Sequence, residues 1–167
     1  LTVTGQLGDV MRESVDAACS YVRSRGHALR VGDPELRSSD LHVHFPAGSV
    51  PKDGPSAGVA VTLAIASVMS RRPVRRDVAV TGEVTLRGRV LEIGGVKEKV
   101  LAAYRAGLRT VVLPKANEKD LRDIPSEVRS ALTFKCVATM DEVLEAMLLP
   151  PRPNGFAEDL PLFEETA

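Results

Sequence analysis

The stretch of this sequence with the most chemical potential is Pro51–Gly58, P-K-D-G-P-S-A-G, which leads into an apolar run ending at Met69. The run has no charged residue and is too short to span a bilayer, which predicts a helix buried in a protein core. Pro55 suits the first turn of that helix, and Asp53 or Gly54 can cap it. Ser56 would then lie among free backbone N–H groups, where a hydroxyl can attack and an oxyanion can be stabilised.

The hydroxyl of Ser56 needs a base if it is to attack, and histidine is the usual choice. The sequence G-P-S-A-G at 54–58 matches the nucleophile elbow of α/β-hydrolases, but no strand leads directly into Ser56. The elbow also requires a histidine after the serine, whereas His27, His42 and His44 all precede it. A triad in another chain order, with His42 or His44, stays open, as does a simple capping role for Ser56.

Two further patterns carry weaker chemistry. His42 and His44 share one face of an alternating strand and could bind a metal, but no cluster of Cys, Asp or Glu supplies further ligands. We therefore predict no metal site. Gly94 and Gly95 precede a helix, as phosphate-binding glycines do, but neither the P-loop pattern nor G-x-G-x-x-G surrounds them, so we predict no nucleotide site.

A lysine is the remaining candidate base, because a Ser–Lys dyad needs neither histidine nor aspartate. The amine must be neutral to accept a proton, so its pKa must fall from about 10.4 to about 7–8 through burial among apolar or small groups. Lys97 and Lys99 lie in such a segment after Gly95. On a helix they point about 200° apart, so at most one can face Ser56, and periodicity does not choose between them.

The elements that must position these groups alternate between strands and helices. Apolar stripes at helical spacing, period-two patterns and glycine or proline punctuation predict their places. We expect strands at 1–4, 41–45, 77–81, 110–113 and 133–137, a hairpin turning at Gly88, and helices at 7–25, 57–69, 96–106 and 140–149, with weaker short helices at 118–122 and 126–131.

The order of these elements and the composition predict the class of protein. Because strands and helices interleave but include a hairpin, we expect an α+β fold: a single mixed-sheet domain over residues 1–149 with packed helices. Prolines and acidic residues predict a flexible tail over 150–167. The 22 basic and 22 acidic residues balance, which argues against a nucleic-acid or anionic-membrane surface. Cys19 and Cys136 show no metal-type spacing and are expected to be reduced core residues. No stretch resembles a signal peptide, so we expect a cytoplasmic protein.

Several blocks of the sequence resemble the proteolytic domain of the ATP-dependent Lon protease family. The resemblance covers about residues 1–149, with order and spacing kept. Its most specific blocks are P-K-D-G-P-S-A-G at 51–58, T-G-E-V-T-L-R-G-R-V at 81–90 and I-G-G-V-K-E-K at 93–99, and residues 1–26 and L-H-V-H at 41–44 match the same family.

The resemblance assigns roles to the candidate residues. In the family, the serine of the first block is the nucleophile and the second lysine of G-G-x-K-E-K is the general base. This implies that Ser56 and Lys99 form the catalytic dyad, with Lys99 chosen over Lys97. Thr81 corresponds to the residue whose hydroxyl hydrogen-bonds the lysine. Residues implied to support the site are Asp53, in the loop that shapes it, and His42, His44 and Glu83, in its surroundings.

The implied function is that of a serine endopeptidase, the peptidase part of an ATP-dependent Lon protease that degrades unfolded or damaged proteins. Family members form hexameric rings, so we expect a homo-oligomer acting on unfolded polypeptides, with neither nucleic acid nor membrane as a partner. ATP and Mg²⁺ belong to an ATPase module absent from this chain, so we expect no cofactor in the chain itself. Ala47 stands where many relatives have the glutamate of V-P-E-G-A-T, which bears on substrate preference.

A non-enzymatic role is the rival interpretation. Some recombination and chelatase ATPases carry Lon-like domains with degenerate sites that serve assembly or binding. Such domains lack the serine or the lysine, whereas Ser56 and Lys99 are both present here. We therefore expect a peptidase, with backbone N–H groups at the start of the 57–69 helix stabilising the oxyanion.

Overall fold

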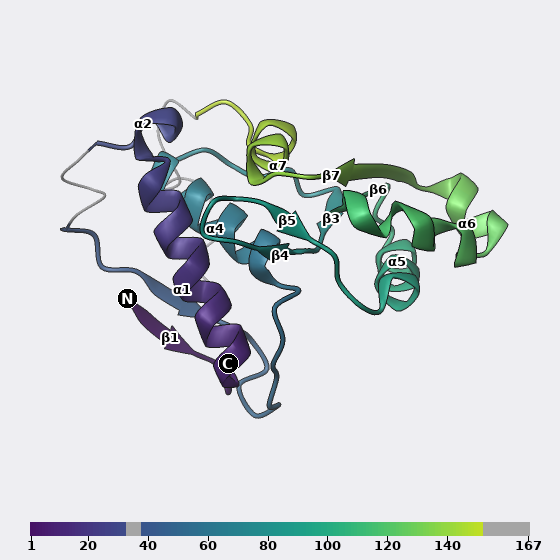
Figure 1. Ribbon diagram of the computed structural model, residues 1–167, viewed down its shortest axis with the longest axis horizontal. Helices are drawn as coiled ribbons and strands as arrows, with labels where there is room; N and C mark the ends of the chain where they lie inside the picture. The colour runs from purple at the N-terminus through teal and green to yellow at the C-terminus, as the bar shows by residue number, and fades with distance from the viewer. Residues whose placement is uncertain (33–37, 152–167) are drawn as a thin grey trace, which may run out of the picture.

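The computed structural model describes residues 1–32 and 38–151, so nearly all of the tail predicted for 150–167 lies outside the described residues (Figure 1). The elements, in chain order, are β1 (Thr2–Thr4), α1 (Asp9–Ser24), α2 (Gly26–Leu29), β2 (His42–His44), α4 (Gly58–Ser70), β3 (Val78–Val80), β4 (Glu83–Val84), β5 (Val90–Leu91), α5 (Val96–Arg105), β6 (Thr110–Pro114), the 3₁₀ helix η1 (Lys115–Asp123), α6 (Ser126–Ala131), β7 (Thr133–Val137) and α7 (Met140–Met147).

Helix α1 follows the predicted amphipathic stripe, since Met11, Val15 and Val22 are all buried. Its end differs from the prediction. The helix predicted over 7–25 ends at Ser24, and Gly26, the glycine that follows the predicted range, begins the short helix α2. Arg30 takes the left-handed conformation at the end of α2, with φ 57°.

Helix α4 is the predicted apolar helix, and it packs against α1 and α7. Most of its side chains are buried, and the buried Thr62 hydroxyl donates to the Gly58 carbonyl at 2.7 Å. One face is open, however: Ala64 is exposed and Val68 keeps 61% of its surface exposed. This open face of the helix matters for the cavity described below.

The α+β class is confirmed, but the strands of the described residues form three small sheets where one was expected. Strands β1 and β2 are parallel, β3, β6 and β7 form a parallel sheet, and β4 and β5 form the predicted antiparallel hairpin. The sheets separate because the chain leaves β3 at Gly82, where φ is +154°. The Gly82 N–H donates to the Ser56 carbonyl and its C=O accepts from the Val59 N–H, both at 3.0 Å, so this backbone pairs with the start of α4 rather than with a strand.

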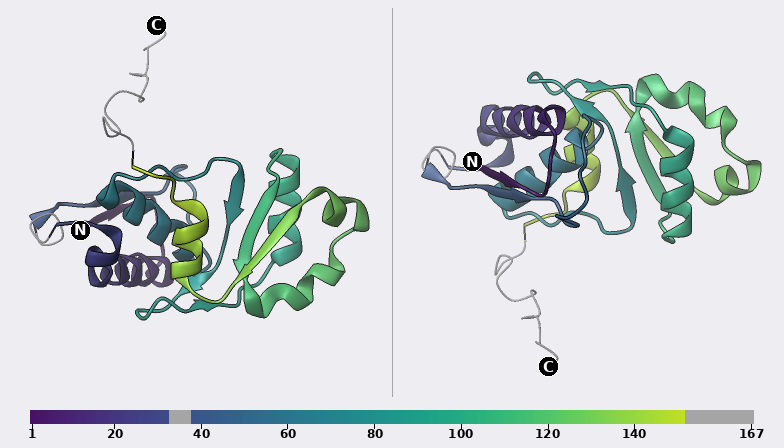
Figure 2. Two further views of the ribbon diagram at one scale, coloured as in Figure 1. Left: turned by 90° about the horizontal axis from the view of Figure 1, so that it is seen from above. Right: turned by 90° about the horizontal axis from the view of Figure 1, so that it is seen from below.

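The three-stranded sheet divides the interior into two apolar cores. Along β6 the side chains alternate: Val112 packs into a core with α1, α4 and α7, whereas Val111 and Leu113 pack into a second core with α5 and α6. Figures 1 and 2 show the same division, with α1, α4 and α7 gathered at one end of the molecule and α5, η1 and α6 at the other. We call these two parts the α4 lobe and the α5 lobe.

Candidate active site

Ser56 lies in a tight turn that leads into α4. The Gly58 N–H donates to the Pro55 carbonyl at 3.0 Å, which closes the turn around the serine. Gly58 is buried, and a Cβ at this position would lie 3.0 Å from the backbone nitrogen of Val84 and 3.0 Å from the Ser14 hydroxyl. The absence of a side chain at Gly58 therefore lets the start of α4 approach β4 closely.

The end of β3 positions the serine from the other side. The Ser56 carbonyl accepts hydrogen bonds from the Gly82 N–H at 3.0 Å and from the Thr81 hydroxyl at 3.2 Å. Three hydrogen bonds, including the one that closes the turn, thus set the place of Ser56, and none of them uses its own hydroxyl. The Oγ atom stays available for chemistry.

A lysine of the α5 lobe, Lys99, lines one cavity together with Ser56. Ser56 and Lys99 both line a cavity of about 490 Å³ whose other walls are almost wholly aliphatic; they comprise Ala57, Ala60, Ala79, Val80, Thr81, Ala102, Ala103, Ala106, Leu108 and Val111. Lys99 is half-buried, and its Nζ donates to the Gly94 carbonyl at 2.8 Å. Lys97 is exposed and lines a different cleft, beside Asp120 and Asp123. The fold therefore brings one of the two lysines to Ser56.

Within the described ranges, no hydrogen bond joins the Ser56 hydroxyl to the Lys99 amine, and the amine donates to the Gly94 carbonyl. Gly94 lies just before α5, so the lysine side chain folds back over the start of its own helix. Because a lysine side chain has several rotatable bonds, its Nζ can leave the Gly94 carbonyl without movement of α5.

Two backbone donors near Ser56 suit an oxyanion. The Gly58 and Val59 N–H groups are already bonded to the Pro55 and Gly82 carbonyls. In the part of the chain that the structure describes, the N–H groups of Ser56 and Ala57 donate no hydrogen bond. Because they precede the first turn of α4, they are oriented donors at the positive end of a helix.

Comparison with known families places the chain. Residues 1–150 match the Lon protease (S16) C-terminal proteolytic domain. The chain belongs to this family. It is 54% identical to the Lon protease of Heliobacterium modesticaldum over 92% of its length, 57% identical to that of Anaeromyxobacter dehalogenans over 89%, and 56% identical to that of Dictyoglomus thermophilum over 93%. These alignments cover 18–20% of the relatives, so the chain spans about a fifth of their length.

The residues that the Lon resemblance implied as supporting ones lie in different places. Thr81 lines the cavity with Ser56 and Lys99, but its hydroxyl donates to the Ser56 carbonyl rather than to the lysine. Glu83 lies outside this cavity, in a groove with Pro55 and residues of α1. Of these two, only Thr81 is placed to touch the reacting groups.

Asp53 does not cap α4, and that prediction was wrong. Its Oδ1 accepts from the Met11 N–H at 2.8 Å and from the Gly54 N–H at 2.8 Å, so it caps the first turn of α1. The reason is the path of the chain: the Lys52 N–H donates to the Gln6 carbonyl at 3.0 Å and its carbonyl accepts from the Gly8 N–H at 2.9 Å, so the next residue lies at the start of α1. A Cβ at Gly8 would lie 2.3 Å from the carboxylate, so Asp53 packs directly on that glycine. Asp53 therefore ties the loop before Ser56 to α1.

Lys52 performs a similar task that sequence reasoning missed. Its Nζ donates to the carbonyls of Gly5, Ala47 and Val50 at 2.8, 3.0 and 2.8 Å. The loop over 46–51 therefore folds around one ammonium group, and Ala47 takes a φ of +60° there. Nothing in the local pattern indicates this role, because its three acceptors include one that lies 47 positions away.

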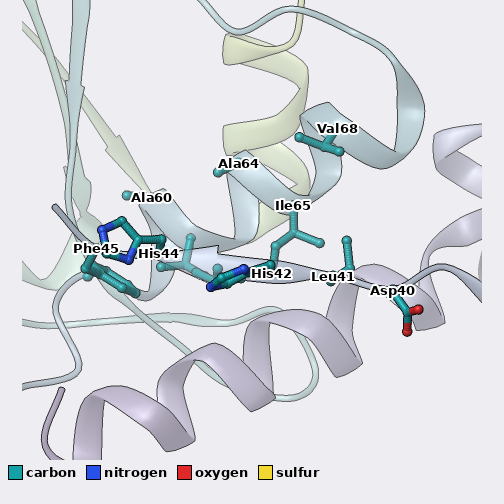
Figure 3. Close-up of a pocket in the computed structure, with 12 residues that line it drawn as sticks. Asp40, Leu41, His42, His44, Phe45, Ala60, Ala64, Ile65 and Val68 are labelled. Carbon is teal, nitrogen blue, oxygen red and sulfur yellow. The ribbon is translucent and has the colours of Figure 1, made fainter. Parts of the chain in front are cut away.

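His42 and His44 lie on the exposed face of β2, outside the cavity that holds Ser56. Their Nε2 and Nδ1 atoms, at 2.9 and 2.8 Å, share the Thr4 hydroxyl on the neighbouring strand. Both line a second cavity, between β2 and α4 (Figure 3). A triad through either histidine has no support in this arrangement. Across residues 1–32 and 38–151, no three side chains of His, Cys, Asp or Glu are grouped as metal ligands would be.

The remaining sequence expectations concern the thiols and membranes. Cys19 is buried, Cys136 is half-buried, and both are free thiols, as predicted. Among the described residues, no helix combines the length and apolarity that crossing a membrane requires.

Proposed function

We propose that this chain is the peptidase part of an ATP-dependent Lon protease and that it works as a serine endopeptidase through a dyad of Ser56 and Lys99. The observation that carries the proposal is the shared cavity: a hydroxyl at a helix start and an amine from the other lobe line one space with aliphatic walls. Such walls exclude water from the reaction and strengthen the electrostatic interactions inside it.

In the proposed reaction the neutral Lys99 amine leaves the Gly94 carbonyl and accepts the proton of Ser56 Oγ as the oxygen attacks a peptide carbonyl. The N–H groups of Ser56 and Ala57 stabilise the oxyanion of the tetrahedral intermediate. The Lys99 ammonium then protonates the leaving amine, and the peptide bond breaks. Lys99 next takes a proton from water, which attacks the acyl carbonyl, and the Lys99 ammonium returns this proton to Ser56 Oγ as the bond between Oγ and the acyl carbon breaks. Thr81 positions Ser56 through its carbonyl and is not a proton carrier in this scheme.

The wider setting rests on the relatives, which are Lon proteases about five times as long as this chain. We propose that the substrates are unfolded or damaged proteins in the cytoplasm and that the complete protein forms a hexameric ring. ATP and Mg²⁺ would act in an ATPase module, outside this chain.

The first test is the reaction of Ser56 itself. Incubation with an aryl boronate or a fluorophosphonate, followed by peptide mass spectrometry for the latter, should place the adduct on Ser56. Cleavage of a fluorogenic peptide should fall to background in Ser56→Ala and by about 1,000-fold or more in Lys99→Ala. Lys99→Arg should be as inactive as Lys99→Ala, because a guanidinium does not deprotonate at accessible pH.

The chain offers matched controls for both groups. Ser49→Ala changes an exposed serine of the preceding loop, and Lys97→Ala changes the exposed lysine on the same helix; each should keep wild-type cleavage within about twofold. Cleavage that survives Ser56→Ala, or that depends on Lys97 rather than Lys99, would refute the dyad.

A further inference from the structure

We infer that the free edge of β2 and the open face of α4 bind an extended stretch of the substrate polypeptide and accept one of its apolar side chains. The inference rests on the proposed function, since it names a subsite beside the proposed catalytic cavity. The evidence is the second cavity of about 490 Å³, bounded by residues 40–45 on one side and by α4 on the other (Figure 3).

The first argument concerns the edge of β2. In the described ranges β2 pairs with β1 alone. The Leu41 carbonyl accepts from the Thr2 N–H, and the Phe45 N–H donates to the Thr4 carbonyl. Because backbone groups alternate between the two edges of a parallel strand, the N–H and C=O groups of His42 and His44 point away from β1. Six consecutive residues, 40–45, line the cavity, as expected where a cavity runs along an edge rather than over one face.

An unpaired edge of this kind is a template for one more strand. Peptide recognition by strand addition uses such an edge for affinity and a neighbouring pocket for specificity. Here the pocket is supplied by α4, whose residues Ala60, Ala64 and Val68 face β2 across the cavity. Two alanines leave room there, and Val68, although apolar, is 61% exposed when the cavity is empty.

The second argument is continuity with the proposed catalytic site. Ala57 and Ala60 line both cavities, so the two spaces meet over the first turn of α4, directly after Ser56. A chain that pairs with β2 is therefore led toward the nucleophile. Its side chain over Ala64 would contact aliphatic groups from both elements, which favours leucine, isoleucine or phenylalanine over a charged residue.

Ala64→Phe tests this subsite, because Ala64 is exposed and a phenyl group there would fill the cavity without entering the core. We expect kcat/KM for a fluorogenic decapeptide rich in leucine to fall about tenfold. The rate at which a small fluorophosphonate labels Ser56 should stay within about twofold, since this reagent needs only the catalytic cavity. Ala131→Phe, an exposed alanine of α6, is the matched control and should change neither rate.

Val68→Lys supplies a second variant at a largely exposed position, where failure to fold is not expected. It should lower cleavage of leucine-rich peptides while raising the relative rate for peptides that carry glutamate at the same position. Equal loss of peptide cleavage and Ser56 labelling, or no loss in either variant, would overturn the subsite. No labelling of the unsubstituted protein would instead refute the proposed function.

Backbone pairing has its own readout. In peptides that carry one N-methyl group at successive positions, cleavage should fall at every second position, because alternate N–H groups face the edge of β2. A loss that is uniform along the peptide would refute strand addition. Sedimentation should show the same mass for wild type and Ala64→Phe; a change in mass would mean that a second copy of the chain occupies the cavity.

Discussion

The two sides of the candidate site are built differently. On the α4 lobe, Ser56 is positioned by the backbone: its carbonyl accepts from Gly82 and Thr81, and the turn around it closes through Gly58. On the α5 lobe, Lys99 reaches the cavity by a long side chain with one hydrogen bond, to the Gly94 carbonyl. The serine is therefore the immobile partner, and the lysine is the partner that can move.

This difference indicates how the two groups would meet. Moving Ser56 toward the lysine would break several backbone hydrogen bonds, each with a net value of about 1 kcal/mol. Rotating the Lys99 side chain breaks only its bond to Gly94 and crosses ordinary rotamer barriers. Assembly of the proposed dyad is thus expected to depend on the lysine side chain. Damage to the backbone on the serine side should lower activity far more than damage on the lysine side.

The largest effect is expected from a pair of glycine substitutions, one on each side. Gly58→Ala places a Cβ 3.0 Å from the Val84 backbone nitrogen, so the start of α4 must shift and kcat/KM should fall about 30-fold. The unfolding free energy should change by less than about 1 kcal/mol, since alanine favours the helix. Gly95→Ala costs about 1 kcal/mol, because φ there is +68°, but its Cβ meets only the ends of two flexible side chains, Lys99 Nζ at 3.4 Å and Glu98 Oε2 at 3.6 Å.

Peptide cleavage and urea unfolding, measured on Gly58→Ala and Gly95→Ala, separate the effect on activity from the effect on stability. The Gly95→Ala variant should retain kcat/KM within about threefold despite its lower stability. If Gly95→Ala proves less active than Gly58→Ala, activity depends more on the backbone beside Lys99 than on the backbone beside Ser56, contrary to this expectation.

A smaller effect is expected where the loop before Ser56 joins α1. Asp53→Ala removes the acceptor of the Met11 N–H, so the unfolding free energy should fall by about 1 kcal/mol. Cleavage should fall about fivefold, because the loop then moves relative to the serine. Asp16→Ala, an exposed change in the middle of α1, is the control for lost charge. Wild-type activity in Asp53→Ala would show that the turn and β3 position Ser56 without this loop.

The smallest effect lies far from the cavity, in the packing of the α4 lobe. Burial, and then the hydrogen bond to Asp141, raise the pKa of Tyr21 from 10.0 to about 12. Tyr21 therefore loses its proton more easily in the unfolded chain than in the folded one. The stability that its protonated hydroxyl contributes is complete below pH 10 and is lost as the pH rises toward 12. The Tyr21 hydroxyl donates to Asp141, which is partly exposed, so solvent screens this interaction. We therefore expect the unfolding free energy to fall by about 1 kcal/mol, less than the about 2.7 kcal/mol that corresponds to a pKa difference of two units.

Urea unfolding between pH 9 and 12 should therefore show a loss of stability that is about 1 kcal/mol larger in wild type than in Tyr21→Phe. Peptide cleavage at pH 8 should be the same in both. Equal pH dependence of the two proteins would mean that the Tyr21 hydroxyl titrates alike in folded and unfolded chains.

Local patterns were sufficient for much of the fold. The stripe through Met11, Val15 and Val22 predicted α1, and the turn at Gly88 predicted the hairpin of β4 and β5. Both depend on residues a few positions apart, whose side chains share a face or a turn whatever the rest of the chain does. The expectation of one sheet was not met, because it depends on where Gly82 turns the chain after β3.

The candidate site shows the same division. Residue types and spacing were enough to single out Ser56 as a hydroxyl at a helix start and to favour two lysines as its base, with His42 or His44 still open. Periodicity could not choose between them, and family resemblance pointed to Lys99. That Lys99 lines the cavity of Ser56 while Lys97 faces solvent was decided by the packing of α5 against the three-stranded sheet. Likewise, only the pairing of Lys52 with residues 6–8 placed Asp53 at the start of α1. Residue types and local spacing indicate which side chains are able to react. Which of them come together depends on contacts between segments far apart in the chain, and no local pattern encodes those contacts.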